Sequence, residues 1–457
     1  MSLSTDLRGM PLSSSRLISP FAPAPAKIRD LDSYEEFFWL LEQSVSMLGI
    51  IAAEVEGETT VAQWEQALTE VQRCHPLLSA RIHKESHQRP YFARMSEVRV
   101  PLQVAFLSEN TVLSREMEEA LQNSFGDGSG SLLRIYLFHH EKSSALLLAM
   151  HHAAFDGKSG LLILQDILRA IAGEILWPCS TRAISMREVL GQPPLPSYRK
   201  LVKDGVSPRS TDRQVHGLPK VLVNRLVMNA EETRALLDRV KDEKTSVTSA
   251  IMVALVLAGT KYRLAWGNEP VQCISPIDMR RKYGVEDACG LLIGLHHVAL
   301  EATADLPFWE KARYVRGTFE TIGTDEAFLR GLSFHDELVL DEQSPRDAFE
   351  IATSFLTHDF MVTNYAGLDM RTDYGELRIT SLFTGSASAD PRAQKVSVLT
   401  LHGRLGMTLV SRIPIPNLLE EARVILAAAV SEPIHRSLDQ VRSGGPEMSL
   451  HVEGTES

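Results

Sequence analysis

Cysteine is scarce in this sequence, since only four of its 457 residues are cysteine. The four lie far apart and form no C-x-x-C pair, which excludes a disulfide scaffold and argues against a structural zinc site. They are Cys74, Cys179, Cys273 and Cys289. This usage is typical of a reducing compartment, and we expect a cytoplasmic location.

Long hydrophobic runs and a surplus of basic charge are missing as well. The longest apolar run, residues 250–259, is about half of the ~20 residues that cross a bilayer. The N-terminal stretch, residues 1–27, lacks the apolar segment of a signal peptide. Lysine and arginine number 47 against 58 aspartates and glutamates, for a formal net charge of -11. Because a nucleic-acid partner requires a clustered basic surface, we do not expect such a partner. The short apolar run leads us to expect no membrane span.

What remains is a composition close to that of ordinary globular proteins, with 44% hydrophobic and 23% charged residues. Single cores stop growing near ~250–300 residues, so this length predicts two lobes. Helical and strand patterns alternate in both halves and predict an α/β fold with a mixed sheet in each lobe. We predict a flexible arm over 1–30, a first lobe over 31–176, a linker over 177–219, a second lobe over 220–445 and a flexible tail over 446–457.

Hydrophobic periodicity predicts the main elements. Asp32 and Ser33 are both suitable N-cap residues for a first helix, and Glu36 is placed to complete a capping box with Ser33. Further helices are expected over 61–74, 161–173, 231–242 and 247–262, and strands over 47–55, 132–138, 144–150, 221–228, 270–276, 291–300 and 396–411. The strand over 144–150 is apolar on both faces, so we expect it in the centre of a sheet.

One segment combines residue types that carry chemistry. His151 and His152 follow the expected central strand, and Asp156 and Gly157 come four and five residues after His152. Neighbouring side chains on a strand point to opposite faces, so only one histidine of the pair can enter a given cleft. A histidine titrates near pH ~6.5 and suits the role of a general base.

Other interpretations of the segment stay open at this point. Asp156 precedes a predicted helix and fits the role of an N-cap. A metal site built on His152 and Asp156 lacks a third ligand nearby, so we predict no metal. A serine hydrolase has no support, because no G-x-S-x-G elbow is present.

The segment resembles the HHxxxDG signature of the CoA-dependent acyltransferase superfamily, which includes chloramphenicol acetyltransferase, plant BAHD acyltransferases and nonribosomal peptide condensation domains. Three further segments, 72–78, 275–280 and 363–367, resemble the R-H-P-x-L, P-V-D-x-R and S-N-x-G segments of condensation-type and dimycocerosyl transferase relatives. Together they extend the resemblance over roughly residues 31–430. It implies two chloramphenicol acetyltransferase-like lobes with a tunnel between them.

The resemblance also implies roles for the motif residues. His152 would be the general base that deprotonates an acceptor hydroxyl or amine, which then attacks a thioester. Asp156 would pair with an arginine, for which Arg280 is our choice and Arg281 the alternative. Gly157 would allow close approach of the backbone and offer its N–H to the oxyanion. His151 would support the motif structurally.

Substrate contacts are expected at two more places. Asn364 would contact the acyl donor or the oxyanion, or serve as a turn residue. The basic triplet of Arg280, Arg281 and Lys282 would receive CoA phosphates or a carrier protein, or form a solvated surface turn.

The expected function is therefore acyl transfer from an acyl-CoA or acyl carrier-protein thioester to a hydroxyl or amine, in natural-product or lipid biosynthesis. No cofactor is expected to stay bound; the thioester is a co-substrate. A stand-alone condensation enzyme, a catalytically silent binding protein of the same fold and, because His151-x₄-Asp156 fits H-x₄-D, a glycerolipid acyltransferase are the alternatives. Two lobes can complete one site, so we expect a monomer. The sequence does not define the acyl chain or the acceptor.

Overall fold

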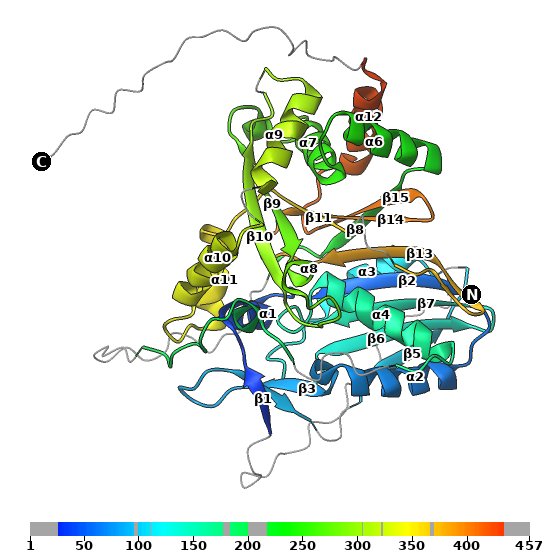
Figure 1. The fold of residues 1–457 in the computed structure, drawn as a ribbon, viewed down its shortest axis with the longest axis vertical. Helices are drawn as coiled ribbons and strands as arrows, with labels where there is room; N and C mark the ends of the chain where they lie inside the picture. The colour runs from blue at the N-terminus through cyan, green and yellow to red at the C-terminus, as the bar shows by residue number, and fades with distance from the viewer. Residues whose placement is uncertain are drawn as a thin grey trace, which may run out of the picture.

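The computed structural model describes residues 26–95, 99–109, 111–176, 183–199, 217–303, 305–320, 323–365 and 370–433. Within them, two six-stranded mixed sheets and one three-stranded sheet form the framework. In Figure 1 the two large sheets lie one above the other along the long axis. The predicted α/β fold with a mixed sheet in each half is confirmed.

The N-terminal sheet has the strand order β12-β13-β2-β7-β6-β5. Its strands are β12 (Asp373–Tyr374), β13 (Leu377–Ser386), β2 (Gly49–Glu56), β7 (Ser143–Met150), β6 (Leu133–His140) and β5 (Leu102–Phe106). The predicted central position of β7 is confirmed, since Leu146 and Leu148 lie in one core and Leu147 and Ala149 in another. The sheet is thus covered by apolar side chains on both faces.

The C-terminal sheet has the order β10-β9-β11-β14-β15-β8. Its strands are β10 (Ile293–Leu300), β9 (Val271–Asp278), β11 (Phe360–Asn364), β14 (Gln394–Leu401), β15 (Arg404–Ser411) and β8 (Leu222–Val227). One predicted strand over 396–411 is wrong, because β14 and β15 form an antiparallel hairpin. His402 and Gly403 both have positive φ and turn the chain there.

One strand joins the two halves of the chain. β13 comes from the second half of the sequence but pairs antiparallel with β2, between Arg378–Glu56 and Ser386–Gly49. The N-terminal sheet therefore does not follow the predicted lobe ranges 31–176 and 220–445. Dividing the sequence into consecutive lobes cannot show that β13 joins the N-terminal sheet, because no local sequence signal tells which strands pair.

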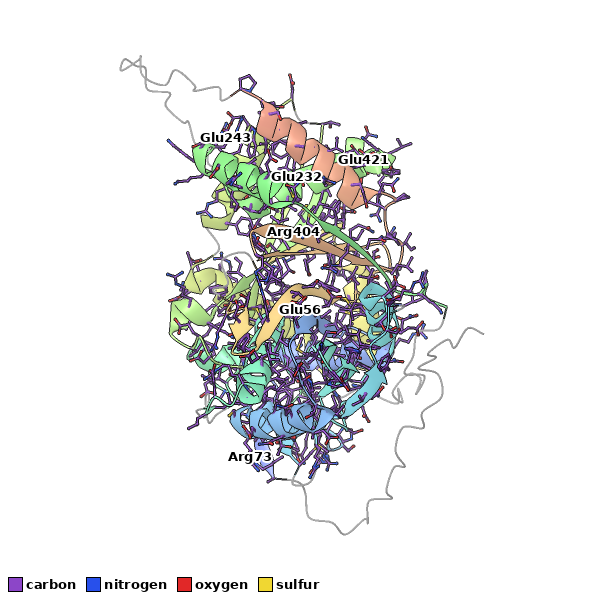
Figure 2. All side chains as sticks on the ribbon, turned by 90° about the vertical axis from the view of Figure 1, so that its right-hand side faces the viewer. Glu56, Arg73, Glu232, Glu243, Arg404 and Glu421 are labelled. Atoms are coloured by element: carbon purple, nitrogen blue, oxygen red, sulfur yellow. The ribbon has the colours of Figure 1, made fainter. Side chains whose placement is uncertain are left out.

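Helices cover the sheets in layers. They are α1 (Ser33–Ser44), α2 (Val61–Cys74), α3 (Leu113–Gln122), α4 (Gly157–Ile171), α5 (Met186–Val189), α6 (Ala230–Asp242), α7 (Val247–Gly259), α8 (Arg280–Tyr283), α9 (Phe308–Glu320), α10 (Asp325–Leu338), α11 (Pro345–Ser354) and α12 (Leu418–Ser431). Figure 1 places α6, α7, α9 and α12 at one end and α2 at the other. Figure 2 shows the same order from the side, with Arg73 of α2 opposite Glu232 of α6 and Glu421 of α12.

One capping box, one helix start and one helix end differ from their predictions. At α1 the N-cap is Asp32, whose capping box uses Glu35 and not Glu36. The helix predicted from residue 161 begins four residues earlier, since α4 starts at Gly157 with Asp156 as N-cap. Its first turn is polar and small, so hydrophobic periodicity alone places its start too late. The helix predicted over 247–262 ends at Gly259.

The predicted termini and linker fall mostly outside the described residues, namely 1–25, 177–182, 200–216 and 434–457. Lys27–Asp30, the end of the predicted arm, instead forms β1, which pairs with β4 (Tyr91–Arg94), while β4 also pairs with β3 (Ala80–His83). No helix in the described ranges is long and apolar enough to span a bilayer.

Candidate active site

A cavity of about 440 Å³ lies where the two large sheets meet, and the HHxxxDG segment forms part of its wall. Both halves of the chain contribute to its lining, which includes residues of α1, α4, α8, β2, β7, β9, β10, β11, β13 and β14. The apolar part of the wall consists of Phe38, Ile50, Ile51, Met150, Phe155, Ile293, Leu295 and Met361. This surface suits an acyl chain or another apolar group.

The two histidines of the motif have different surroundings. His152 lines the cavity and its ring packs against Phe38, with 4.7 Å between the ring centroids. His151 is fully buried, and its Nδ1 accepts a hydrogen bond of 3.2 Å from the Ala153 N–H. The prediction that only one histidine enters the cleft is confirmed, and the one that does so is His152.

Both histidines are held neutral at physiological pH. Burial and then the positive charge of Lys395 lower the pKa of His152 to about 4. Burial lowers the pKa of His151 to about 3. His152 therefore carries an unprotonated imidazole, the form that can accept a proton.

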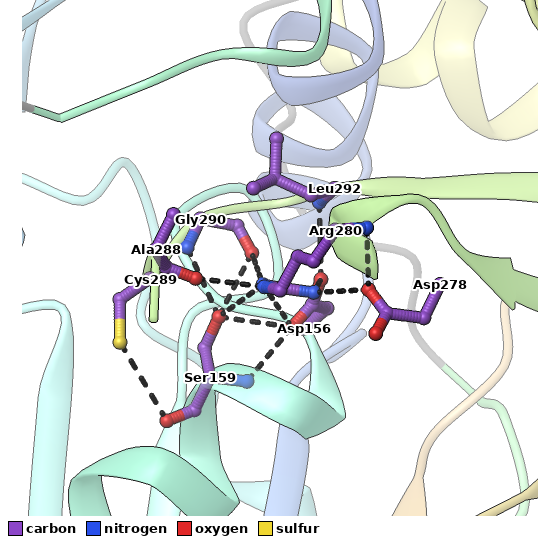
Figure 3. A network of polar contacts seen from close by, with 8 residues as sticks. All are labelled: Asp156, Ser159, Asp278, Arg280, Ala288, Cys289, Gly290 and Leu292. Carbon is purple, nitrogen blue, oxygen red and sulfur yellow. Dashed lines mark hydrogen bonds and ion pairs between the residues drawn. The ribbon is translucent and has the colours of Figure 1, made fainter. Parts of the chain in front are cut away.

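The predicted pair of Asp156 and Arg280 is present and is bidentate (Figure 3). Arg280 Nη1 lies 2.9 Å from Asp156 Oδ2, and Nη2 donates to Oδ1 at 2.9 Å. Both residues are buried. Arg280 also binds Asp278 Oδ1 at 2.8 Å and donates from Nε to the Ala288 carbonyl at 2.7 Å. Arg280, and not Arg281, is therefore the partner of the motif aspartate.

Backbone and serine groups complete this network. Ser159 donates to Asp156 Oδ1 from its N–H at 2.8 Å and from its hydroxyl at 2.9 Å, and the Leu292 N–H donates to Oδ2 at 3.0 Å. Burial alone would raise the pKa of Asp156, but Arg280 and these donors hold it below its usual value. The same carboxylate raises the pKa of the buried Arg280. The network fastens the start of α4 to the segment before β10.

Gly157 lies against Tyr365, so any side chain at this position would require the tyrosine ring to move. A Cβ placed there would lie 1.7 Å from the hydroxyl oxygen of Tyr365. Gly157, Tyr365 and His152 all line the cavity. Close approach at Gly157 is thus confirmed. Its N–H is in the first turn of α4 and has no acceptor within the helix.

Of the three remaining predicted contact residues, Asn364 and Arg281 line the cavity and Lys282 does not. Asn364 lines the cavity, and its Nδ2 donates to Thr248 Oγ1 at 2.8 Å. Arg281 also lines the cavity, with an exposed side chain. Lys282 is outside the lining and lies 2.8 Å from Asp325 Oδ1. The basic triplet is therefore not one patch, because Arg280 is buried on the cavity wall and bound to carboxylates, Arg281 lines the cavity with an exposed side chain, and Lys282 is paired outside the cavity.

Sequence reasoning missed Lys395, a buried lysine on β14 that lines the cavity. The signal that could have found it is alternation in the strand, where Val396 and Val398 belong to the core while Lys395 and Ser397 line the cavity. A period-two pattern with lysine on its polar side indicates a strand that faces either solvent or a site.

The described residues offer two further facts about ligand sites. A second cavity, about 530 Å³, is lined by Arg263, Trp266, His358, Asp359 and Arg392 among others and contains none of the predicted site residues. No group of three or more histidine, cysteine or acidic side chains in the described ranges is arranged to hold a metal ion.

Comparison with known proteins begins with the sequence. The family model of the condensation domain matches residues 40–173, which include the whole HHxxxDG segment. A hybrid PKS-NRPS synthetase, xenE of Xenoacremonium sinensis, is 26% identical over 155 residues, or 33% of this chain. The chain spans only 4% of the length of that curated relative.

Solved structures match over most of the chain. Polyketide synthase associated protein 5 from Mycobacterium tuberculosis has a TM-score of 0.64 at 17% identity, covering 89% of this chain and 99% of its own. The first condensation domain of the CDA synthetase gives 0.62 at 16%, covering 89% and 97%. F. sporotrichioides TRI101, solved with coenzyme A and T-2, gives 0.61 at 14%, covering 87% and 96%.

These matches confirm the predicted fold, which over most of the chain is that of the solved condensation domains. They also bear out the resemblance of the motif region to condensation domains, since the family model spans the HHxxxDG segment.

Proposed function

We propose that this protein is an acyltransferase that moves an acyl group from an acyl-CoA or carrier-bound thioester to a hydroxyl or amine, with His152 as the general base. The observation that carries the proposal is the neutral imidazole of His152 on the wall of a cavity lined by both sheets. Similarity to condensation domains and acyltransferases supports the same class of reaction.

The chemistry requires one proton to move twice. His152 takes the proton of the acceptor, whose oxygen or nitrogen bonds to the thioester carbonyl carbon and forms a tetrahedral oxyanion. The oxyanion collapses, the C–S bond breaks, and the imidazolium returns the proton to the leaving thiolate. Base catalysis of this kind supplies about 10²–10⁴-fold in rate. A pKa near 4 makes His152 a weak base, so stabilisation of the oxyanion must drive much of the step.

The rest of the motif supports this step by position. The pair of Asp156 and Arg280 holds the start of α4, and with it Gly157, against the cavity. The Gly157 N–H is our candidate donor to the oxyanion, because helix N-termini carry N–H groups without intrahelical acceptors. Asp156 is bound to Arg280, Ser159 and Leu292, so we assign it a positioning role and no proton transfer.

The test is release of free thiol from a panel of acyl-CoA donors and acyl carrier proteins, each with hydroxyl and amine acceptors, followed by mass spectrometry of the products. The His152→Ala variant should lose about 10²–10⁴-fold in turnover while its circular dichroism spectrum and thermal midpoint stay close to wild type. Turnover equal to wild type in His152→Ala would disprove the base assignment.

His140→Ala is the matched control. His140 belongs to another histidine pair, at the end of β6, but is exposed and outside the cavity lining. It should retain wild-type turnover. If both variants lost activity equally, the loss would reflect a general effect of histidine removal.

A stand-alone condensation enzyme is the second candidate, favoured by the family model and by the hybrid PKS-NRPS relative. It differs in its acceptor, which would be bound to a carrier protein. Products formed only with a tethered acceptor would select this function, and products formed with a free small acceptor would select the first.

A further inference from the structure

Lys395 is a buried ammonium group on the wall of the cavity that holds His152, and we propose that it binds a carboxylate carried by one of the substrates. The inference rests on the proposed function and deepens it, since it assigns a charge to a substrate of the same site. Lys395 is a binding residue in this proposal and takes no part in proton transfer.

The first argument is the position of Lys395 in the sheet. β14 pairs with β11 on one side and β15 on the other, so Lys395 sits opposite Met361 and Val410. Its side chain is on the cavity side of the strand, with Ser397 two residues along. Only 6% of the residue is exposed. The ammonium is therefore withdrawn from bulk water but adjoins the space that a substrate would fill.

The second argument is the lack of a counter-ion. Lys395 Nζ donates to the Ala387 carbonyl at 2.7 Å and, more weakly, to Ser386 Oγ at 3.4 Å. An ammonium has three donors, so at least one stays available. In the part of the chain that the structure describes, no carboxylate lies within ion-pairing distance of Lys395.

The carboxylates elsewhere in the cavity wall do not serve Lys395. Asp156 and Asp278 are both bound to Arg280. Glu286 is exposed. The nearby histidines cannot offset the charge either, because an imidazole is neutral or positive; burial and then this ammonium lower the pKa of both His152 and His358.

The remaining question is why a protein would keep this charge. Burial lowers the pKa of Lys395 to about 8, and no acidic group opposes the shift. At pH 7 the group is still mostly protonated, so the folded chain holds a charge in a position that disfavours it. Unpaired buried charges are costly, and they are found where a ligand or function requires them.

A carboxylate fits this site better than other anions. The wall beside Lys395 offers one ammonium and the hydroxyls of Ser386 and Ser397, which suits a planar group with two oxygens. Apolar side chains make up much of the remaining lining, which suits the hydrocarbon part of the same molecule. A carboxyl group joined to a carrier or to CoA is a neutral thioester, so the bound carboxylate must be a free one.

Two sources of that carboxylate are chemically distinct. It can belong to the acceptor, which is then a free hydroxy or amino acid. It can also be the second carboxylate of a dicarboxylic acyl donor. Binding measurements separate the two sources without requiring turnover.

The experiment uses isothermal titration calorimetry on the full chain with two matched pairs of probes. The acceptor pair is 2-hydroxyisocaproate and 2-hydroxyisocaproamide, and the donor pair is succinyl-CoA and pentanoyl-CoA. We expect the wild type to bind the carboxylate of one pair about 10- to 100-fold more tightly than its neutral match. In Lys395→Met this preference should fall to within about 2-fold, and Lys395→Arg should restore part of it.

Two control variants locate the effect. Lys241→Met removes an exposed lysine of α6, far from the cavity lining, and should leave the preference unchanged. Lys158→Met removes the other lysine of the cavity wall, which lies near Asp278 and Asp287. If Lys158→Met abolished the preference and Lys395→Met kept it, the anion site would lie at α4 and the proposal would be wrong.

Equal binding of both members of each pair to the wild type, at millimolar concentration, would also overturn it. So would competition by inorganic phosphate as strong as that by the carboxylate, because the site would then be a general anion site. Failure of the general-base proposal is separate, because that appears as unchanged turnover in His152→Ala while the binding preference persists.

Discussion

Arg280 and Lys395 are two buried cations on the same cavity, but their surroundings differ in kind. Arg280 has two carboxylates, a serine hydroxyl and two backbone carbonyls as partners. Lys395 has one carbonyl and one distant hydroxyl. The charge of Arg280 is paired with carboxylates within the protein, which fits a structural role. The charge of Lys395 has no carboxylate partner among the described residues, which leaves the ammonium available to the substrate carboxylate that we propose.

The largest effect should come from breaking the satisfied network. Arg280→Met removes a buried guanidinium and leaves Asp156 with an uncompensated charge, so we expect a loss of about 3–5 kcal/mol in the free energy of unfolding. Urea denaturation monitored by circular dichroism measures it. Arg281→Met, at the neighbouring exposed position, should change stability by no more than about 0.5 kcal/mol. If Arg280→Met changed the stability as little as Arg281→Met does, the Arg280 network would not be the structural support that distinguishes Arg280 from Lys395.

Removal of Lys395, the other buried cation, should raise the free energy of unfolding where removal of Arg280 lowers it. The pKa of Lys395 is about 8 in the folded protein against 10.5 for an ordinary lysine. Each pKa unit corresponds to about 1.4 kcal/mol, so Lys395→Met should raise the free energy of unfolding by about 3 kcal/mol at pH 7. Thermal and urea unfolding at several pH values provide the measurement.

The sign of this pH dependence follows from proton binding. Between pH 8 and 10.5 the unfolded chain binds more protons at this lysine than the folded chain does, so wild-type stability rises with pH in that window. The advantage of Lys395→Met should therefore be full below pH 8 and vanish above 10.5. His152 and His358, with pKa values of about 4 and 3, stay neutral throughout and do not contribute. A variant less stable than wild type at pH 7 would contradict an uncompensated charge.

The smallest effect concerns the third basic residue near the site. Lys282 is exposed and its partner Asp325 is exposed too, so Lys282→Met should cost no more than about 1 kcal/mol. Because Lys282 is outside the cavity lining, acyl transfer by this variant should match the wild type. Reduced turnover with a carrier-protein donor but not with an acyl-CoA would instead show that Lys282 contacts a carrier.

Much of the site could be predicted from short stretches of sequence. The order of His151, His152, Asp156 and Gly157 between a buried strand and an amphipathic helix is a local pattern, and the structure places it at the cavity as expected. The partnership with Arg280 came from resemblance to a family, since no local signal links residues so far apart in the chain.

The wrong or missing predictions have two physical causes, tertiary packing and local cap or turn geometry. The exchange of β13 into the N-terminal sheet depends on which edge of β2 is open, and the environment of Lys395 depends on the packing of β13 beside β14. The α4 start and the β14–β15 hairpin are local, but they depend on cap and turn geometry and not on hydrophobic period. Periodicity reports burial along one element and is silent about its neighbours.

The amino-acid sequence by itself determined many of the helices and strands and the position of the motif between a buried strand and a helix, because these depend on residues adjacent in the chain. Only the tertiary structure decided that His152 and not His151 faces the cavity, and that Arg280 is saturated with partners while Lys395 is not. Solvation and charge pairing are properties of the whole packed interior, and they differ between two cations that look alike in the sequence.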